Sequence, residues 1–347
     1  MNFDKLKLKI IIIFIIFNYQ YINVKKRIGV IGLRHSQNVG NNLLKYALFI
    51  KLSELGYSPY MVGKRFLNHN INFIKNYTRI RLIKNFSEIK ENDFDILMVS
   101  SDQTWNVVIE NFYDTAFLKF AEKWKIPKFI YGTSLGFDKW KFSEKDEQVA
   151  KHLLKNFTGI SVREKSAVKL IENHLGLKAQ FVLEPTFLID KKYYLNLIEN
   201  FKSDIIKSNN NNYIFVYNII ESSNFINYLS YVKKMLNIEI FFLNIFHDNQ
   251  VKEFLYGVIN CKAVITDSFH GTVFSILFNK PFISFENLKY DSRFNNLNEI
   301  FNIKNRIFNL SSIPPVSLLN KSLQINRSKL KILKRKSINY LKKNLNF

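Results

Sequence analysis

The stretch RIGVIGLRHSQNVGNNLLKYALFIKLSELGYSPYMV, residues 27–62, decides the fold of this chain. It opens with a short apolar run that ends at Leu33 and leads into a polar loop. Apolar residues then recur at helical spacing as far as Gly56, a residue type that commonly ends a helix, and a second apolar run starts at Tyr60. Strand, loop, helix and strand in this order form a βαβ unit, which predicts a parallel sheet.

The same pattern recurs along the chain. Short apolar runs that stop at polar residues lie at 95–100, 128–131, 159–162, 213–216, 238–243, 263–266 and 281–285. We therefore predict an α/β protein of two domains, with the boundary near residues 186–205, where a polar stretch leads into an Asn-rich segment. The predicted parts are an N-terminal extension, two α/β domains and a basic C-terminal helix, at residues 1–26, 27–190, 191–315 and 316–347.

Composition narrows the class of protein. The chain has 347 residues, of which 47% are hydrophobic and 23% charged, and this is globular composition. Its formal charge of +23 attracts anions such as nucleic acid, anionic lipid or phosphorylated substrates, although a general Lys-rich bias explains it equally well. Nucleic acid is not expected, because no helix-turn-helix, zinc-finger spacing or RNP-type strand is present. The single cysteine, Cys261, excludes an intrachain disulfide and fits a cytoplasmic protein, where we expect it to be a buried thiol.

Both ends of the chain raise the question of a membrane. Lys5, Lys7 and Lys9 precede an apolar run at 10–17, as in a signal peptide, but no small-residue cleavage site follows. The run is also much shorter than a membrane-spanning helix, which needs about 20 residues. We interpret it as an appended segment. Together with a helical, Lys- and Arg-rich tail from 326 onward, it leaves open a peripheral contact with an anionic membrane.

The most informative motif is VITDSFHGTVFSILFNKPFISF, residues 264–285. A buried strand ends there and a helix begins, and ligands of open α/β sheets bind beyond such strand ends. The helix N-terminus favours an anion such as phosphate, and Ser268 and Thr272 can supply hydroxyl donors. His270 suits general acid chemistry, and Gly271 allows a ligand to approach the backbone. The alternative is a helix cap with a solvent-facing histidine.

Three other strand ends carry polar residues. Arg163 follows a strand, where a guanidinium can hold a carboxylate or phosphate, or simply form an ion pair with Glu164. In SSDQTWN, residues 100–106, amide and carboxylate groups surround Trp105, which is typical either of a sugar-binding surface or of a buried capping network.

The loop after the first strand holds the remaining candidates. Asn38, Gly40 and Asn41 open a helix there, which indicates a turn that faces a phosphate or an acceptor. The sequence of this loop is neither GxGxxG nor a Walker loop.

Taken together, these blocks resemble the polysaccharide pyruvyl transferase family. The matching segments are Asn38–Asn41 with its helix, SSDQTWN at 100–106, ISVRE at 160–164 with LEPTFLID at 183–190, TDSFHGTVFSILFNKPF at 266–282, and the closing helix, so that the resemblance covers roughly residues 27–345. It implies a glycosyltransferase-B-like fold of two Rossmann-like domains that face each other across a cleft. It also implies phosphoenolpyruvate as the donor and a sugar as the acceptor, which together form a pyruvate ketal.

The resemblance also distributes roles among the candidate residues. It implies that His270 is catalytic, and we assign Asp102 as the second catalytic residue, a base toward the acceptor. The expected donor-binding residues are Arg163, Ser268, Phe269, Gly271 and Thr272. The expected acceptor-binding residues are Asn38, Asn41, Gln103, Trp105 and Asn106. Ser268 departs from the family pattern, since members with a defined pyruvyl activity often carry Arg at that position; likewise Glu184 stands where Asp is commoner and Ser100 where Gly is usual.

We therefore expect a cytoplasmic transferase that acts on a cell-surface polysaccharide or on its lipid-linked precursor. Phosphoenolpyruvate is its expected co-substrate, with no cofactor and no metal. Two alternatives remain at this point. One is a glycosyltransferase that uses a nucleotide-diphosphate sugar in the same cleft. The other is a non-catalytic basic protein that binds a membrane surface or nucleic acid.

Overall fold

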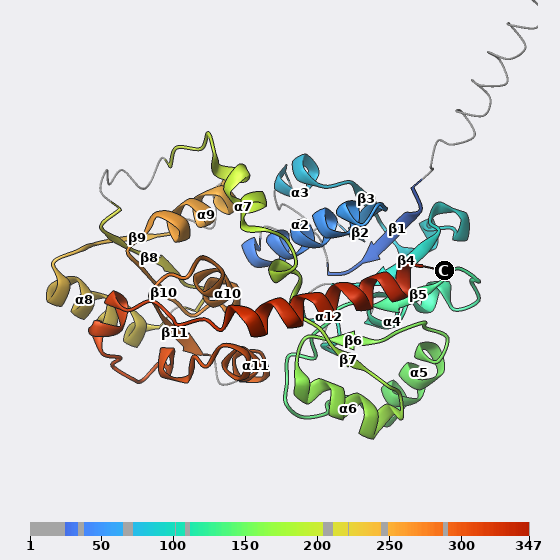
Figure 1. Ribbon diagram of the computed structural model, residues 1–347. Coiled ribbons are helices and arrows are strands. Elements are labelled where there is room, and N and C mark those ends of the chain that lie inside the picture. Colours follow the sequence, from blue (N-terminus) through green and yellow to red (C-terminus); the bar gives the residue numbers. More distant parts are fainter. Residues whose placement is uncertain are drawn as a thin grey trace, which may run out of the picture.

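The computed structural model describes residues 25–33, 38–64, 72–100, 102–107, 112–203, 211–220, 222–243, 249–286 and 291–346. Its architecture is two parallel α/β units side by side, each built on one five-stranded sheet (Figure 1). The predicted α/β fold of Rossmann-like units is confirmed. Most of the predicted N-terminal extension lies outside the described residues, and the predicted domain limits stay a prediction.

The first sheet has the strand order β3-β2-β1-β4-β5, and all of its pairings are parallel. Its strands are β1 (Arg27–Ile31), β2 (Ser58–Lys64), β3 (Ile80–Ile83), β4 (Ile96–Val99) and β5 (Lys128–Ile130). A two-stranded extension continues it with β6 (Ser161–Val162) and β7 (Gln180–Phe181). Strand β4 is buried along its whole length, as expected of a parallel strand with helices on both faces.

The helices of this unit follow the apolar spacing seen in the sequence. They are α2 (Val39–Glu54), α3 (Asn72–Tyr77), α4 (Phe112–Phe117), α5 (Glu144–Leu154) and α6 (Lys165–Leu175), with short 3-10 turns at η1 (Phe86–Glu88), η2 (Glu91–Asp93), η3 (Lys119–Ala121) and η4 (Pro185–Phe187). Helix α2 begins at Asn38, whose side chain accepts a hydrogen bond from the backbone N–H of Asn41 at 2.8 Å.

The second sheet has the order β12-β11-β10-β8-β9 and is also parallel throughout. Its strands are β8 (Tyr213–Tyr217), β9 (Glu239–Phe242), β10 (Ala263–Thr266), β11 (Phe282–Glu286) and β12 (Ile307–Asn309). Its helices are α7 (Lys191–Ile198), α8 (Ser223–Leu236), α9 (Gln250–Asn260), α10 (Phe269–Phe278) and α11 (Asp291–Phe301), with the 3-10 turns η6 (Lys304–Arg306) and η7 (Val316–Asn320).

The last helix, α12 (Arg327–Leu345), crosses from the second unit back to the first (Figure 1). The hydroxyl of Tyr340 donates to the carbonyl of Ile130 at 2.7 Å, and the hydroxyl of Ser337 accepts from the backbone N–H of Leu183 at 2.8 Å. A Cβ at Gly159 would lie only 2.8 Å from the Tyr340 hydroxyl, so the absence of a side chain there allows α12 to pack closely. The basic tail therefore belongs to the folded core at its C-terminal half.

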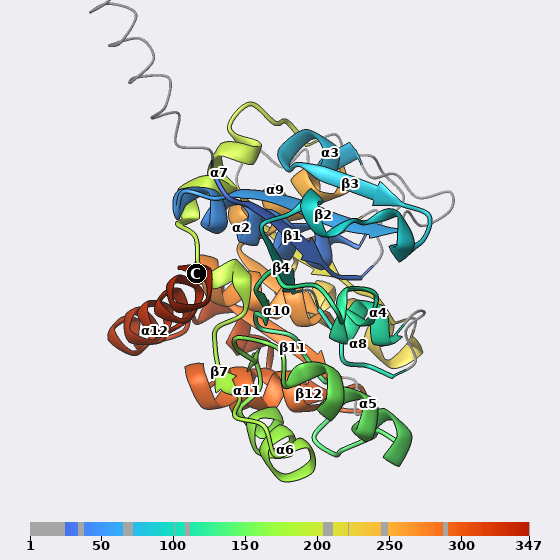
Figure 2. The same ribbon diagram turned by 90° about the vertical axis from the view of Figure 1, so that its right-hand side faces the viewer.

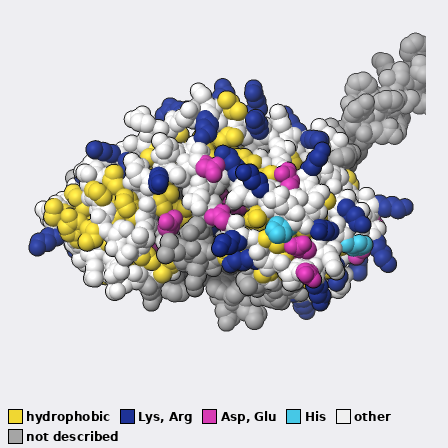
Figure 3. All heavy atoms as spheres, turned by 90° about the horizontal axis from the view of Figure 1, so that it is seen from below, with side chains coloured by type: hydrophobic (Ala, Val, Ile, Leu, Met, Phe, Trp, Pro, Cys, Tyr) yellow, Lys and Arg dark blue, Asp and Glu magenta, His cyan; other side chains and the backbone are white. Residues whose placement is uncertain are grey.

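Figure 2 shows α12 at one side of the molecule, opposite the side on which β3 lies. On the face drawn in Figure 3, Lys and Arg side chains are scattered among neutral ones and do not form a continuous basic track. Within the described residues, no helix is both long and apolar enough to cross a bilayer. Cys261 is buried as expected, and burial raises the pKa of its thiol to about 12.

Candidate active site

His270 lies in the first turn of α10, directly after β10, where the two units meet. The side chain of Ser268 caps the helix by accepting a hydrogen bond from the N–H of Gly271 at 3.3 Å. The backbone N–H of Ser268 in turn donates to the hydroxyl of Thr266 at 3.0 Å. This cap places His270 inside the protein, with only 4% of the residue exposed, so it is not the solvent-facing histidine of the alternative interpretation.

His270 faces a carboxylate from the other side of the junction. Its Nε2 lies 3.5 Å from Oε1 of Glu184, and both side chains are buried. Neither of these two atoms has a hydrogen-bond partner among the described residues. The other carboxylate oxygen of Glu184 accepts hydrogen bonds from the backbone N–H and the hydroxyl of Thr186. Glu184 is therefore held in place, while His270 keeps hydrogen-bonding capacity for a ligand.

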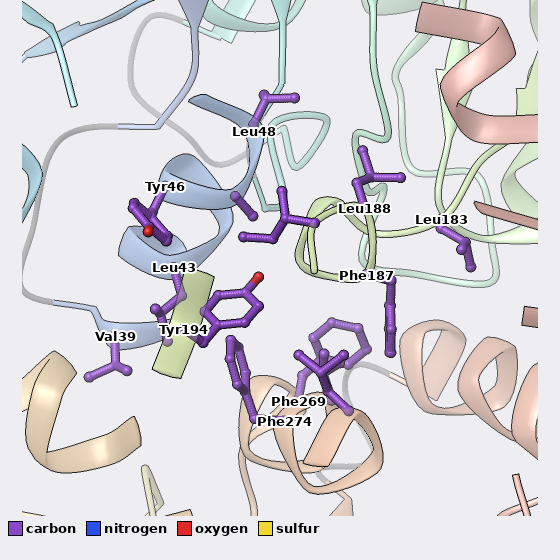
Figure 4. Close-up of a cluster of buried hydrophobic side chains, with 14 of the residues drawn as sticks. Val39, Leu43, Tyr46, Leu48, Leu183, Phe187, Leu188, Tyr194, Phe269 and Phe274 are labelled. Atoms are coloured by element: carbon purple, nitrogen blue, oxygen red, sulfur yellow. The ribbon is translucent and has the colours of Figure 1, made fainter. Parts of the chain in front are cut away.

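Helix α2 covers the other side of the imidazole. A Cβ at Gly40 would overlap the ring of His270 and would lie 2.8 Å from the His270 Cβ. Apolar side chains of α2, α7 and α10 belong to one core cluster, and Figure 4 shows Leu43 of α2, Tyr194 of α7 and Phe274 of α10 close to one another. Gly40, which the sequence indicated only as part of a ligand-facing turn, is thus a second point, beside Glu184, at which the first unit approaches the predicted catalytic residue.

This contact makes a specific substitution informative. Gly40→Ala is expected to displace the His270 ring, because the added methyl group has no room, and to lower kcat by about 10- to 100-fold, as small misplacements of reacting groups do. The protein should remain folded, since alanine is compatible with a helix. Steady-state kinetics and circular dichroism measure the two properties. Gly56→Ala is the control. Gly56 follows α2 in open space at a φ of +93°, so an alanine there strains the backbone without touching the imidazole. An unchanged kcat in Gly40→Ala would contradict the inferred contact.

Two arginines converge on one aromatic ring beside the histidine. The guanidinium carbons of Arg163 and Arg293 lie 4.8 Å and 5.1 Å from the ring centroid of Phe269. Both arginines also approach Asp102: Arg163 through a direct hydrogen-bonded ion pair, and Arg293 with 3.7 Å between Nη1 and Oδ1. Phe269 and Asp102 thus hold two guanidinium groups close together, an arrangement suited to bind a ligand with more than one negative charge.

A second carboxylate is buried in this cluster. Glu164 is 2% exposed and lies 3.5 Å from Nε of Arg163. Burial raises the pKa of Glu164, and the positive charge of Arg163 only partly opposes this effect. Burial also acts to raise the pKa of Asp102, but the charges of Arg163, Arg293 and His270 outweigh it and leave that pKa well below its usual range. Asp102 therefore has a low proton affinity. Its contacts fit a role in positioning the two arginines better than the predicted role of base.

The space inside the cluster is small. A void of about 10 Å³ is lined by Arg163, Glu164, Arg293 and Asn296, among others, which is room for roughly one water molecule. Nε and Nη1 of Arg163 and both carboxylate oxygens of Glu164 have no hydrogen-bond partner among the described residues. Such hydrogen-bonding capacity in buried charged groups is typical of a site that is completed by a ligand. No group of three or more His, Cys, Asp or Glu side chains that could hold a metal ion occurs in the described part of the chain.

The structure brings together only some of the other predicted donor-binding residues. Phe269 is beside both arginines, as described above. The hydroxyl of Thr272 donates to the carbonyl of Ser268 at 3.1 Å and bonds to the hydroxyl of Ser284 at 2.6 Å, so it joins α10 to the sheet. A Cβ at Gly271 would lie 2.9 Å from Cβ of Thr266, which means that this glycine allows helix and strand to pack closely. Ser268, Gly271 and Thr272 thus have structural contacts that account for them, and their binding roles stay a prediction.

Some of the predicted acceptor-binding residues are buried in the core, and others are exposed or half-buried. Trp105 is 1% exposed and packs edge-to-face on Phe117 at 5.4 Å, so its ring lies in the core and offers no surface to a sugar in this conformation. Asn106 is 7% exposed, beside it, whereas Gln103 is half-buried. The ring of this motif is therefore buried, while Nε1 of Trp105 and Nε2 of Gln103 have no hydrogen-bond partner among the described residues, and the acceptor-binding roles stay a prediction. Asn38 is exposed at the start of α2 and Asn41 is buried one turn later, and part of the loop before them lies outside the described residues.

Sequence reasoning missed several residues of this cluster. Arg293 comes from α11 and Asn296 from the next turn, where its side-chain amide donates to the carbonyl of Arg163 at 2.7 Å. Glu184 was noted only as a departure from a pattern. No local signal marks these residues, because each depends on a contact between distant segments.

The two parallel α/β units, each built on one five-stranded sheet, define the glycosyltransferase-B-like fold. That fold does not by itself give an activity. The model of the polysaccharide pyruvyl transferase family matches residues 38–289, and the chain belongs to that family. This confirms the resemblance noted in the sequence. The family implies a sugar or polysaccharide as the acceptor.

Solved structures share the fold. MnaA of S. aureus, in a co-structure with UDP, has a TM-score of 0.58 at 13% identity, covering 92% of this chain and 97% of its own. The UDP-GlcNAc 2-epimerase of Neisseria meningitidis, bound to UDP-GlcNAc, has a TM-score of 0.54 at 9% identity, covering 92% and 99%. The corresponding epimerase of Methanocaldococcus jannaschii has a TM-score of 0.53 at 10% identity, covering 90% and 99%. At these identities the similarity concerns the fold alone. No curated protein sequence matches the chain.

Proposed function

We propose that this transferase moves the pyruvyl group of phosphoenolpyruvate onto two hydroxyls of a sugar in a polysaccharide or its lipid-linked precursor, forming a cyclic ketal. The observation that supports this most strongly is the buried pair of His270 and Glu184 beside two guanidinium groups held on one ring. An enol phosphate with a carboxylate needs both features: an acid for its carbon, and cations for its two anionic groups.

The reaction requires two proton transfers. One sugar hydroxyl forms a bond with C2 of phosphoenolpyruvate while C3 takes up a proton and becomes a methyl group. The C2–O bond to phosphate then breaks, and a second hydroxyl closes the ketal. The two hydroxyl protons end on the methyl carbon and on the released phosphate, so atoms and charges balance without any oxidant or cofactor. We assign protonation of C3 to His270, whose Nε2 faces the carboxylate of Glu184.

The donor's negative charges would lie against Arg163 and Arg293. Many family members carry an arginine where this chain has Ser268, and the loss of that cation argues against phosphoenolpyruvate if nothing replaces it. Arg293 supplies a second cation in the same neighbourhood from α11, since its guanidinium lies against the ring of Phe269, the residue after Ser268. Arg163 and Arg293 together would neutralise the carboxylate and the phosphate.

The acceptor base is less directly supported. Asp102, the expected base, is engaged by both arginines, which lower its proton affinity. Glu184 and Glu164 are the other buried carboxylates of the cluster, and burial raises the pKa of Glu164. We therefore infer that Asp102 acts as a positioning residue for the arginines. A substrate anion that competes for the arginines would release it.

The alternative of a glycosyltransferase keeps some support. Two of the similar structures contain UDP or UDP-GlcNAc, and a diphosphate could bind to the same arginines. The alternative of a non-catalytic basic protein has none of this support, because the chain belongs to a transferase family.

Thermal unfolding with different ligands separates the two enzymatic functions. A ligand at 100 times its dissociation constant adds about 2.7 kcal/mol to the free energy of unfolding. With roughly 2–4 °C per kcal/mol in domains of 150–250 residues, we expect phosphoenolpyruvate to raise the Tm by several degrees. Pyruvate and inorganic phosphate, which carry one anionic group each, should have smaller effects, and UDP-GlcNAc none.

The matched variants are Arg293→Gln and Arg335→Gln. The first removes a guanidinium of the site and should abolish most of the shift caused by phosphoenolpyruvate, whereas the second removes an exposed arginine of α12 and should leave it unchanged. A shift with UDP-GlcNAc and none with phosphoenolpyruvate would favour the glycosyltransferase.

A further inference from the structure

A second, larger cavity lies behind the charged cluster. It has a volume of about 560 Å³, which is within the range of roughly 300–1,000 Å³ that small-molecule sites occupy. The residues around it come from η4, α7, the end of α10 and the extended segment that leads into α12: Phe187, Lys191, Ile276, Leu277, Asn279, Ser322, Leu323, Gln324, Ile325, Arg327 and Leu330. Both chain segments that connect the two units therefore contribute to its walls.

Just over half of the residues that line this cavity are apolar. Six of its lining residues are hydrophobic, and they come from four separate segments: Phe187, Ile276, Leu277, Leu323, Ile325 and Leu330. Leu323, Ile325 and Leu330 are only partly buried, although they pack on the main core cluster. All three line the cavity. An aliphatic chain placed there would remove apolar surface from water, which is worth about 0.8 kcal/mol for each buried CH₂ group.

Two cations stand at the rim. Lys191 begins α7 and Arg327 begins α12, and both are exposed residues that line the cavity. Burial lowers the pKa of Lys191, and the positive charge of Arg327 lowers it further, so the two charges are close enough to repel each other. Neither cation forms an ion pair with any residue that the structure describes. The nearby carboxylate of Asp190 caps α7 by accepting a hydrogen bond from the backbone N–H of Lys192 at 3.0 Å.

Apolar wall residues together with two cations that line the same cavity are complementary to an amphiphile with an anionic head. We propose that this cavity binds a lipid phosphate, with the aliphatic chain against Leu323 and Ile325 and the phosphate between Lys191 and Arg327. The anionic head would relieve the repulsion between the two cations, and the chain would cover the exposed apolar wall. A free phosphate would contact only the two cations at the rim, and a neutral amphiphile would contact only the apolar wall.

The site is distinct from the proposed active site but touches it. Phe187 lines both the cavity and the small void among the arginines. The cavity and the void are therefore neighbours that share this residue. The proposal does not depend on the identity of the donor, because it rests only on the walls and the rim of the cavity.

Calorimetric titration with alkyl phosphates tests the proposal. Octyl phosphate and decyl phosphate, each at concentrations where it is monomeric, should bind one molecule per chain. The affinity should rise roughly tenfold or more from the octyl to the decyl chain, as expected for two additional buried CH₂ groups. Inorganic phosphate and octyl glucoside should bind at least tenfold more weakly than octyl phosphate. The proposal would be overturned if inorganic phosphate or octyl glucoside bound as tightly as octyl phosphate, or if the alkyl phosphates did not bind.

Variants locate the binding. The double variant Lys191→Gln/Arg327→Gln should weaken decyl phosphate by about tenfold, in line with the loss of charge-assisted contacts at a solvent-exposed rim. The double variant Lys331→Gln/Lys336→Gln removes the same charge from exposed positions of α12 outside the cavity and should bind like the wild type. Leu323→Ser should weaken decyl phosphate without affecting inorganic phosphate. If both charge variants lose affinity equally, binding is general attraction to a basic protein and the proposal is wrong.

Discussion

His270→Gln is expected to lower kcat by 100- to 10,000-fold, the range that general acid catalysis typically contributes. Glutamine has a similar reach and retains hydrogen-bonding groups, but it cannot transfer a proton at neutral pH. Because the arginines that would bind the donor are unchanged, the Tm increase caused by phosphoenolpyruvate should persist. Release of phosphate in the presence of a polysaccharide acceptor measures turnover, and thermal unfolding measures binding.

Two further variants identify the role of the pair. Glu184→Gln removes the charge that faces Nε2 of His270 while keeping the side chain's size, and it should give a kcat between those of the wild type and His270→Gln. Combining both substitutions should cost little more than His270→Gln alone, since residues that act as one unit are not additive. His174→Gln is the matched control, because His174 is a half-buried histidine of α6 outside the site. Near-wild-type turnover in His270→Gln would rule out the assigned acid.

Arg163→Met is expected to reduce the free energy of unfolding by about 3–5 kcal/mol, the usual cost of removing one partner from a buried ion pair. Arg163 is 2% exposed and is the cation nearest to both Asp102 and Glu164. Methionine fills part of the volume, but it leaves two carboxylates without their main compensating charge. Urea denaturation followed by tryptophan fluorescence and by circular dichroism measures the loss, and donor binding should disappear together with it.

The pH dependence of this variant follows from the same charges. Without Arg163, the carboxyl groups of Glu164 and Asp102 should have higher pKa values in the folded protein than in the unfolded chain. The folded protein then binds protons more readily, so its stability falls as pH rises through this range. The deficit relative to the wild type should therefore be smaller at pH 5 than at pH 7. A deficit independent of pH would show that packing, and not charge, causes the loss.

Two comparisons control for other causes. Arg163→Met/Glu164→Gln removes one of the uncompensated carboxylates and should recover part of the lost stability. Arg27→Met breaks an ion pair with Asp95 at 3.2 Å, in which the two side chains are 42% and 40% exposed. That pair should contribute at most about 1 kcal/mol, as exposed ion pairs generally do. If Arg27→Met were as damaging as Arg163→Met, the buried cluster would have no special role.

Much of the fold could be predicted because its signals are local. Parallel strands buried on both faces appear as short apolar runs, and the polar residues that follow mark the strand ends. The runs at 95–100, 128–131 and 263–266 correspond to β4, β5 and β10. The helical tail was also predicted, although its packing on the first unit through Tyr340 was not, because apolar spacing does not say which surface a helix meets.

The candidate site was predicted less completely. Two polar side chains at strand ends, those of His270 and Arg163, were found from their position after an apolar run. For Trp105 the sequence left two interpretations open, a sugar-binding surface and a buried network. In the structure its ring lies in the core against Phe117. A motif of polar residues around an aromatic ring does not reveal which of these two environments it occupies, since both need the same hydrogen-bonding groups.

By itself the sequence determined the α/β class, the strand ends and the two motif residues most worth testing, because these depend on spacing within a few residues. Only the tertiary structure decided that Glu184 faces His270, that Gly40 covers it and that Arg293 joins Arg163 on the ring of Phe269. Each of these contacts joins segments that are far apart in the chain. Their distances follow from how the two sheets and their helices pack, and no local pattern of residue types encodes them.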